Sequence, residues 1–179
     1  MPNLLPIQAK LLNWYVSEKR DLPWRKTDDP YKKFVAEIML QQTQVSRVIN
    51  KYQEFVERFP SFEVLAKTSR TEVIRMWGPL GYNIRAVRLH IIAKRIVDEH
   101  EGTLPSNPQI LRTFKGVGQY TVAALSSFAF GENIAVVDTN IRRILTRLTG
   151  QTSPLRAEQL EAVARSFLPS GNTSDWNQA

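Results

Sequence analysis

Hydrophobic residues recur along most of this chain with the period of an α-helix. Residues 6–18 carry their apolar side chains close to helical spacing, and a broad apolar face extends over residues 30–57. Asn83 caps a long amphipathic segment that ends near Glu99. The two-residue alternation that predicts β-strands is slight. The pattern therefore predicts an all-α fold.

Shorter helices are predicted where capping residues precede apolar runs. Ser61 and the Ser69-x-x-Glu72 pattern start two of them. Asn107, followed by Pro108 at the first helical position, starts a third. No internal repeat or low-complexity linker separates these segments.

A glycine-bounded turn joins the third of these helices to the next one. Gly116-Val117-Gly118 opens a helix of small residues that runs to about Ala129. Free backbone N–H groups at the start of a helix suit a phosphate group. Helix, glycine hairpin and helix form a unit that presents amides to one phosphate without reading base sequence.

The composition favours an anionic partner. Of the 179 residues 42% are apolar, which is enough for one sizeable core or two small lobes, and the formal net charge is +7. A globular chain this basic usually binds an anionic partner, and nucleic acid is the leading candidate. The same net charge is also explained if the surplus of positive charge only aids solubility. Charge alone leaves both interpretations open.

Several classes of site are excluded by the residue types. The sequence has no cysteine, which excludes disulfides, thiolate zinc sites and an iron–sulfur cluster within these residues. Two histidines are too few for a multi-histidine metal site. No apolar run approaches the ~18 residues that a membrane span needs, and the first residues lack the regions of a signal peptide. We expect no bound metal and a cytoplasmic location.

Two acidic residues stand out by their neighbours. Glu37 lies between Ala36 and Ile38 on an apolar face. It either points outward, which is the commoner case, or is desolvated in a cleft, where a raised pKa would let it donate a proton at neutral pH. Asp138 ends a short apolar run and precedes a basic amphipathic segment. That position at a helix start suits a cationic transition state.

Large side chains in two loops have both a binding and a packing interpretation. Trp24 and Arg25 follow Pro23 in a loop, where they would stack on a base, but the local sequence favours Trp24 closing the core. Residues 77–82 hold three helix breakers and two large side chains that look exposed. This loop either pushes a wedge into the base stack or forms an apolar staple between helices.

Amide and guanidinium side chains supply further candidates. Residues 41–44, Gln-Gln-Thr-Gln, are suited to reading or replacing base edges, although a helix also tolerates such residues. Arg142, Arg143 and Arg147 fall near one helical face. They either contact backbone phosphates or face solvent.

Five of these stretches, taken in this order, carry a resemblance to a known family and cover residues from about 20 to 150. They are Leu22-Pro23-Trp24-Arg25, Glu37-Ile38-Met39-Leu40-Gln41-Gln42-Thr43-Gln44-Val45, Trp77-Gly78-Pro79-Leu80-Gly81-Tyr82, Gly116-Val117-Gly118-x-Tyr120-Thr121 and Val137-Asp138-Thr139-Asn140. Asn177-Gln178-Ala179 adds a weaker match. The chain resembles the helix–hairpin–helix base-excision glycosylases, and within them the MutY-type adenine DNA glycosylases.

The resemblance implies a fold of two lobes with an extruded base between them. A six-helix barrel lobe would cover residues 21–131, with the helix–hairpin–helix at 107–130, and a second helical lobe would combine 1–20 with 132–179. Glu37 would be the general acid, and Asp138 would stabilise the sugar cation. The base pocket would be lined by Trp24, Arg25, Tyr120 and Gln178, and the gap in the duplex would be filled or wedged by Gln42 and Tyr82. A phosphate would be held by the hairpin residues Lys115, Gly116, Val117 and Gly118. The remaining residues assigned to DNA would be Asn140 and Arg142.

The implied chemistry agrees with the residue types. Breaking an N-glycosidic bond generates an oxocarbenium-like sugar, so one carboxyl protonates the leaving base while another stays ionised beside the cation. Family members that also cut the DNA backbone carry a nucleophilic lysine where this chain has Tyr120. Tyrosine at this position therefore implies a monofunctional glycosylase. Tyrosine also occurs in members that release thymine or uracil from mispairs with guanine. The amide run at 41–44 favours adenine opposite guanine or 8-oxoguanine.

Two parts of the family are missing from the sequence. The family usually continues into a four-cysteine [4Fe-4S] loop, and adenine enzymes add a domain that recognises 8-oxoguanine. Because neither is present, the chain is either a fragment, since it looks cut short, or a family member without a cluster, and we expect no cofactor within it. We further expect a nucleoid-associated monomer that binds mismatched double-stranded DNA. A non-catalytic helix–hairpin–helix DNA-binding module is the alternative from a different class.

Overall fold

The computed structural model describes residues 5–179. Every regular element in that range is a helix, which confirms the all-α prediction. Residues 1–4 lie outside the described residues. They belong to the expected second lobe and to the stretch in which the sequence shows no signal-peptide features. No helix in the described part of the chain is long and apolar enough to cross a membrane.

The chain forms two compact units that divide within helix α8. One comprises Asp21–Leu125 and is called the continuous unit here. The other, the terminal unit, combines the residues up to Arg20 with Ser126–Ala179. The lobe boundary expected from the sequence lies slightly later, at residue 131.

Helices of very different length make up each unit. The continuous unit contains η1 (Pro23–Arg25), α2 (Pro30–Leu40), α3 (Val45–Arg58), α4 (Phe62–Lys67), α5 (Arg70–Trp77), η2 (Gly78–Leu80), α6 (Ile84–His100), α7 (Pro108–Thr113) and most of α8 (Gln119–Phe128). The terminal unit contains α1 (Leu5–Glu18), the end of α8, α9 (Thr139–Leu148), α10 (Ala157–Ser166) and α11 (Thr173–Gln178).

Side-chain caps fix several of the predicted helix starts. The Ser61 hydroxyl accepts a hydrogen bond from the Val64 N–H at the start of α4. At the start of α7, the side-chain oxygen Oδ1 of Asn107 accepts a hydrogen bond from the Gln109 N–H at 2.8 Å. Both satisfy N–H groups that have no partner inside their own helix.

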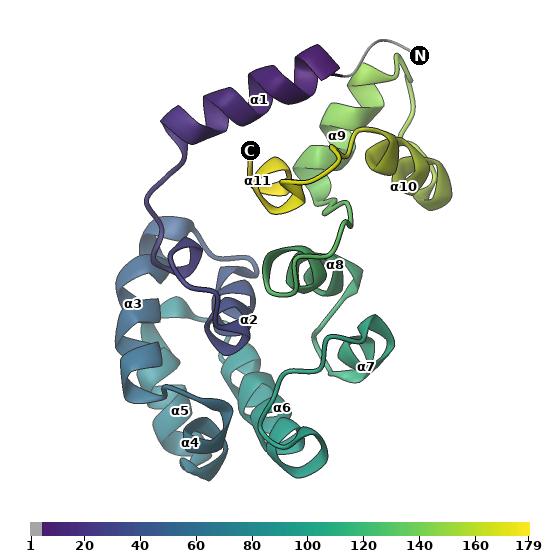
Figure 1. Ribbon diagram of the computed structural model, residues 1–179. Coiled ribbons are helices and arrows are strands. Elements are labelled where there is room, and N and C mark those ends of the chain that lie inside the picture. Colours follow the sequence, from purple (N-terminus) through teal and green to yellow (C-terminus); the bar gives the residue numbers. More distant parts are fainter. Residues whose placement is uncertain (1–4) are drawn as a thin grey trace. The chain divides into compact units, whose positions relative to one another are not determined.

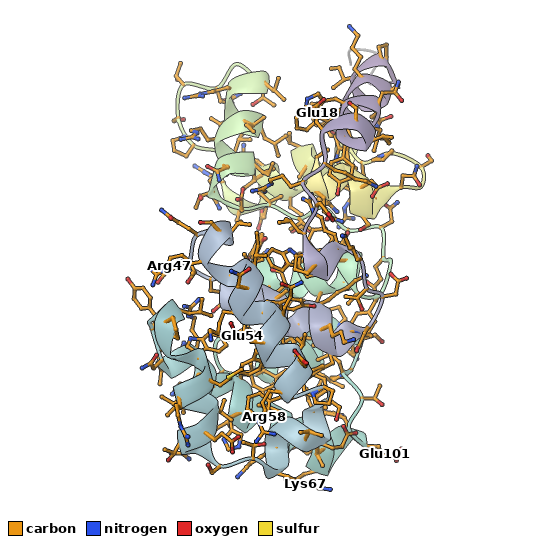
Figure 2. The ribbon with its side chains drawn as sticks, turned by 90° about the vertical axis from the view of Figure 1, so that its left-hand side faces the viewer. Glu18, Arg47, Glu54, Arg58, Lys67 and Glu101 are labelled. Carbon is orange, nitrogen blue, oxygen red and sulfur yellow. The ribbon has the colours of Figure 1, made fainter. Side chains whose placement is uncertain are left out.

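Two of the predicted caps differ from expectation. Asn83 precedes α6, but its side chain makes no capping hydrogen bond. The Ser69 hydroxyl accepts from the Glu72 N–H as expected, yet the Glu72 carboxylate does not return to Ser69. It pairs instead with Arg58 at the end of α3 (Figure 2), because a guanidinium is the stronger hydrogen-bond donor.

Aromatic side chains fill the core of the continuous unit. Helices α4 and α5 both pack against α6 (Figure 1). Phe55 lies edge-on between Phe59 and Trp77, with ring centroids 4.8 and 5.9 Å away. Of the two aromatic side chains in the 77–82 stretch, Trp77 is fully buried and Tyr82 is 65% exposed. The expectation of two exposed side chains is therefore wrong for Trp77.

The terminal unit is held together by a smaller apolar cluster and by contacts between its two segments. The cluster consists of Leu145, Leu155, Leu160 and Ala164, with Ala135, Val137, Ile141, Val163 and Phe167 packed against it. Helix α1 packs on α11. Its Gln8 amide donates to the Phe167 carbonyl at 3.0 Å.

Candidate active site and nucleic-acid interface

Glu37 lies in the third turn of α2, surrounded by the apolar residues that fix this helix in the continuous unit. Phe34, Val35 and Ile38 are buried, and Glu37 itself keeps partial exposure. Its carboxyl makes no hydrogen bond or ion pair with any residue of the described chain. Desolvation by burial raises the pKa of Glu37 from 4.5 to about 7. A carboxyl with that pKa retains its proton on about half of the molecules near neutral pH.

Asp138 begins helix α9 in the terminal unit. Its Oδ1 accepts a hydrogen bond from the Ile141 N–H at 2.7 Å, and its Oδ2 accepts from the Asn140 amide at 3.3 Å. The side chain of Asp138 is therefore held by the first turn of α9, whereas the Glu37 carboxyl has no hydrogen-bond partner among the described residues.

Asn177 on α11 fixes the extended segment that leads to Asp138. Its Oδ1 accepts from the Val136 N–H at 3.1 Å, and its Nδ2 donates to the Ile134 carbonyl at 2.8 Å and the Ser127 hydroxyl at 2.9 Å. Sequence reasoning noted Asn177 only within a weak terminal match. No local pattern identifies it, because its partners lie more than 40 residues away in the sequence.

The predicted helix–hairpin–helix is formed by α7, residues 114–118 and α8. Val117 is buried, whereas Lys115, Gly116 and Gly118 are exposed. Gly116 has a φ of +97°, a backbone conformation that favours glycine. Within residues 5–179 the N–H groups of Gly116 and Gly118 donate to no protein acceptor. The hairpin thus presents unpaired backbone donors to solvent.

Gln41 connects this hairpin to the loop after α2. Its side-chain amide donates to the Gly116 carbonyl at 3.1 Å and approaches the Thr121 hydroxyl at 3.4 Å. The amide-rich run therefore serves partly as structure. Gln42, the next residue, is exposed. A side chain that fills a gap in a DNA duplex needs to be exposed in this way.

The remaining candidates fall in both units. In the continuous unit, Trp24 is buried edge-on against Tyr52 with ring centroids 5.4 Å apart, and Arg25, the last residue of η1, is half-buried. The packing alternative for Trp24 agrees with this position. Tyr120, in the first turn of α8, is 41% exposed.

The terminal unit contains the other three candidates. Asn140 and Arg142 are exposed on the first turn of α9. Gln178 on α11 accepts a hydrogen bond from the Tyr15 hydroxyl at 3.3 Å and donates to the Ser174 hydroxyl at 3.1 Å. Its amide is therefore oriented by α1 and by its own helix.

No group of three or more His, Cys, Asp or Glu side chains that could hold a metal ion occurs in the described range. A [4Fe-4S] cluster needs thiolate ligands, and the sequence contains no cysteine. The residues present do not fit such a cluster.

A family model for the HhH-GPD superfamily base excision DNA repair proteins matches residues 35–170, which include the Glu37 segment, the hairpin and Asp138. The chain belongs to this superfamily. The HhH-GPD assignment confirms the family that the sequence motifs predicted.

Curated HhH-GPD relatives fall under two substrate names. Adenine DNA glycosylase of Mycolicibacterium smegmatis is 40% identical over 93% of this chain and 57% of its own length, and that of Homo sapiens is 38% identical over 96% and 34%. A thymine/uracil-DNA glycosylase of Methanothermobacter thermautotrophicus is 32% identical over 94% and 78%. The chain spans about a third to just over half of the length of these two adenine DNA glycosylases.

Solved structures confirm the predicted fold. A thermostable thymine-DNA glycosylase superposes with a TM-score of 0.91 at 30% identity, covering 98% of this chain and 82% of its own. Endonuclease III in a non-covalent DNA complex has a TM-score of 0.78 at 18% identity, covering 99% and 82%. At 18% identity, the similarity to endonuclease III shows the fold alone.

Proposed function

We propose that this chain is the catalytic part of a monofunctional DNA glycosylase that hydrolyses the N-glycosidic bond of adenine mispaired with guanine or 8-oxoguanine. The observation that carries the proposal is the Glu37 carboxyl, which is desolvated, has no partner among residues 5–179 and has a pKa of about 7. A carboxyl buried only for stability would be paired or hydrogen-bonded, since burial of a polar group without a partner is unfavourable.

Glu37 would act as the general acid of this reaction. Its proton is transferred to a ring nitrogen of the base, and the electron pair of the breaking C–N bond goes to the protonated base as it leaves. A pKa near the working pH keeps the proton available and still allows its transfer. Water then adds to the sugar cation and loses a proton to the Glu37 carboxylate, which completes the hydrolysis and restores the acid.

Asp138 would stabilise the positive charge that develops on the sugar. Its Oδ1 is held at 2.7 Å by the start of α9, so the carboxylate is oriented before substrate binds. The Asn177 contacts with Val136 and Ile134 fix the backbone just before it. Tyr120, an exposed phenol in the family's lysine position, supplies no amine to attack the sugar, so base removal would not proceed to strand cleavage.

The DNA would be bound through its backbone and through the gap that the extruded base leaves. The unpaired N–H groups of Gly116 and Gly118 suit a phosphate, and Lys115 adds a positive charge beside them. Gln42 and Tyr82 are exposed in loops and would fill the duplex. We place this protein, as a monomer, on nucleoid DNA in the cytoplasm.

Thymine or uracil is the second candidate base. It is favoured by the thymine-DNA glycosylase structure, whose TM-score is 0.91, and by the 32% identity to a thymine/uracil enzyme over 78% of that protein. The adenine relatives have higher identities, 38% and 40%, and therefore decide the order of the two candidates.

A single-turnover assay over a panel of duplexes distinguishes these candidates. The panel contains A·8-oxoguanine, A·G, T·G, U·G and fully paired DNA, and heating in alkali reveals each abasic site as a strand break. We expect breaks at adenine opposite 8-oxoguanine and guanine, and none without alkali. Cutting of T·G or U·G alone would establish the second candidate. No base release from any duplex would mean a non-catalytic DNA-binding module.

A further inference from the structure

Arg85 on α6 is a buried cation without an acidic partner. It is 5% exposed and forms no ion pair within the described residues. An isolated buried charge is unfavourable unless hydrogen bonds compensate it. The guanidinium obtains this compensation from the backbone and side chains of two loops, which contain Gln42 and Tyr82.

The first loop follows helix α2. One nitrogen of the guanidinium, Nη1, donates to the Met39 carbonyl at 2.8 Å, to the Ile38 carbonyl at 3.2 Å and to the Gln41 carbonyl. The other, Nη2, donates to the Thr43 hydroxyl at 2.9 Å. These carbonyls belong to the end of a helix, where no N–H of the helix itself is available to them. Arg85 therefore binds the residues on both sides of Gln42.

The second loop precedes helix α6. Nη2 also donates to the Gly81 carbonyl at 3.2 Å, which accepts a further hydrogen bond from the indole of Trp77 at 3.1 Å. The guanidinium carbon lies 5.3 Å from the Trp77 ring centroid and 5.7 Å from that of Tyr82. Arg47 on α3 supports the same loop, because its guanidinium donates to the Pro79 carbonyl (Figure 2).

Both loops contain a residue in a strained backbone conformation. Gln42 has a φ of +54° and Tyr82 a φ of +47°, values that residues with a Cβ seldom adopt. Such conformations cost roughly 1–3 kcal/mol and persist only where the surrounding contacts enforce them. The side chains of these two residues are nevertheless exposed. The Tyr82 ring contacts the Arg85 guanidinium, so Arg85 itself supports this loop through the side chain as well.

We propose that Arg85 is a positioning residue that holds Gln42 and Tyr82 together in the conformation needed to occupy an interrupted duplex. The inference rests on the proposed function for the roles of those two side chains. Lysine would not replace Arg85, because a compact ammonium lacks the planar fork that reaches both loops at once.

The test compares Arg85→Lys with Arg75→Met, which removes from α5 an exposed charge that makes no hydrogen bond or ion pair in the described range. Fluorescence anisotropy measures the affinity of each variant for a duplex with a tetrahydrofuran abasic analogue opposite guanine and for a fully paired duplex. We expect Arg85→Lys to weaken binding to the analogue at least tenfold, while binding to paired DNA changes less than twofold. Arg75→Met should affect the two duplexes equally.

A second background separates positioning from a general structural role. With Gln42→Ala and Tyr82→Ala already present, Arg85→Lys should lower affinity for the analogue less than twofold. The same tenfold loss in that background, an equal loss on both duplexes, or a wild-type protein without preference for the analogue would overturn the proposal.

A milder variant covers the case in which Arg85→Lys does not fold, as judged by thermal denaturation. Thr43→Val removes one acceptor of Nη2 and should lower affinity for the analogue about threefold, and only where Gln42 and Tyr82 are intact. No loss would contradict the proposal. A wild-type protein that prefers the analogue but releases no base would refute the proposed function alone, since binding is measured apart from turnover.

Discussion

The Glu37 side chain carries a carboxyl group whose burial disfavours the charged form. Its pKa is about 7 in the folded protein against 4.5 for a free carboxyl. Because the folded-state value is raised, the contribution of this group to stability is fully present below about pH 4.5 and is lost as the pH rises through 7. The shift corresponds to about 3 kcal/mol. The residue proposed for proton donation thus opposes folding at neutral pH.

We predict that Glu37→Gln raises stability and abolishes base release. At pH 8 the variant should unfold at a higher denaturant concentration than the wild type, with a gain of up to ~3 kcal/mol, and the difference should vanish at pH 4. The wild-type single-turnover rate should fall about tenfold per pH unit above 7, since the proton is then absent. Denaturation and rate profiles between pH 5 and 9 measure both. A variant no more stable at pH 8 would show that the carboxyl is not desolvated.

For Asp138 we predict a separation of turnover from binding. Asp138→Asn keeps an oxygen that can cap α9 through the Ile141 N–H but loses the negative charge. Turnover should drop at least ~10²-fold, while affinity for the mismatched duplex stays near the wild-type value. Glu158→Gln, which changes an exposed carboxylate on α10, is the control for a lost charge. Equal loss of rate and affinity in Asp138→Asn would assign the residue a structural role only.

At the scale of elements, the two hairpin glycines have different reasons to be glycine. A Cβ on Gly116 would lie 2.9 Å from Arg88 Cδ, and its φ of +97° is strained for any other residue. A Cβ on Gly118 would meet nothing within 4 Å. The fold therefore favours glycine at 116, whereas at 118 no part of the described protein would obstruct a side chain.

We predict that the two alanine substitutions separate folding from DNA affinity. Gly116→Ala should destabilise the protein by about 1–3 kcal/mol. Gly118→Ala should leave the melting temperature within about a degree and still weaken binding to paired DNA, because the methyl group would obstruct a phosphate. Thermal melts and anisotropy titrations check this. Unchanged DNA affinity in Gly118→Ala would argue against a phosphate at the hairpin.

Asn177 is the second element-scale case, because α11 acts on a segment far away in sequence. Asn177→Ala removes three hydrogen bonds and should cost about 2–3 kcal/mol. We predict that it also lowers the single-turnover rate at saturating DNA, since the segment before Asp138 loses its anchor. Gln151→Ala, an exposed amide elsewhere in the terminal unit, is the control. A destabilised variant with full turnover would limit Asn177 to a structural role.

The sequence predicted helices well and long-range contacts poorly, for physical reasons. Caps such as Ser61 and Asn107 act over three residues, and the apolar period of a helix is written in the chain itself. Arg85 resembles any arginine of an amphipathic helix, and its role emerges only when α6 folds against carbonyls more than 40 residues upstream. Glu37 and Asp138 were found through motifs. The desolvation of Glu37 required the packed structure.

At the scale of the whole molecule, the net charge of +7 should govern affinity for DNA. Arg142, Arg143 and Arg147 are exposed on α9. Replacing all three with methionine should reduce the slope of log affinity against log salt concentration by about 0.9 for each DNA phosphate that these arginines neutralise. Arg58→Met, which removes a charge already paired with Glu72, is the control and should leave the slope unchanged. DNA titrations at several salt concentrations measure this slope. An unchanged slope in the triple variant would mean that the three arginines of α9 face solvent.

The terminal unit joins chain segments separated by more than 150 residues, as the hydrogen bonds of Gln8 with Phe167 and of Tyr15 with Gln178 show. During synthesis on the ribosome, α1 emerges before the other helices of the terminal unit and must wait for α11 before the two can pack together. The continuous unit consists of the single segment Asp21–Leu125, so its internal contacts do not need this wait. The segment before Asp138 therefore acquires its Asn177 anchor among the last events of folding. A nascent chain would hold a folded helix–hairpin–helix well before the segment that leads to Asp138 is anchored.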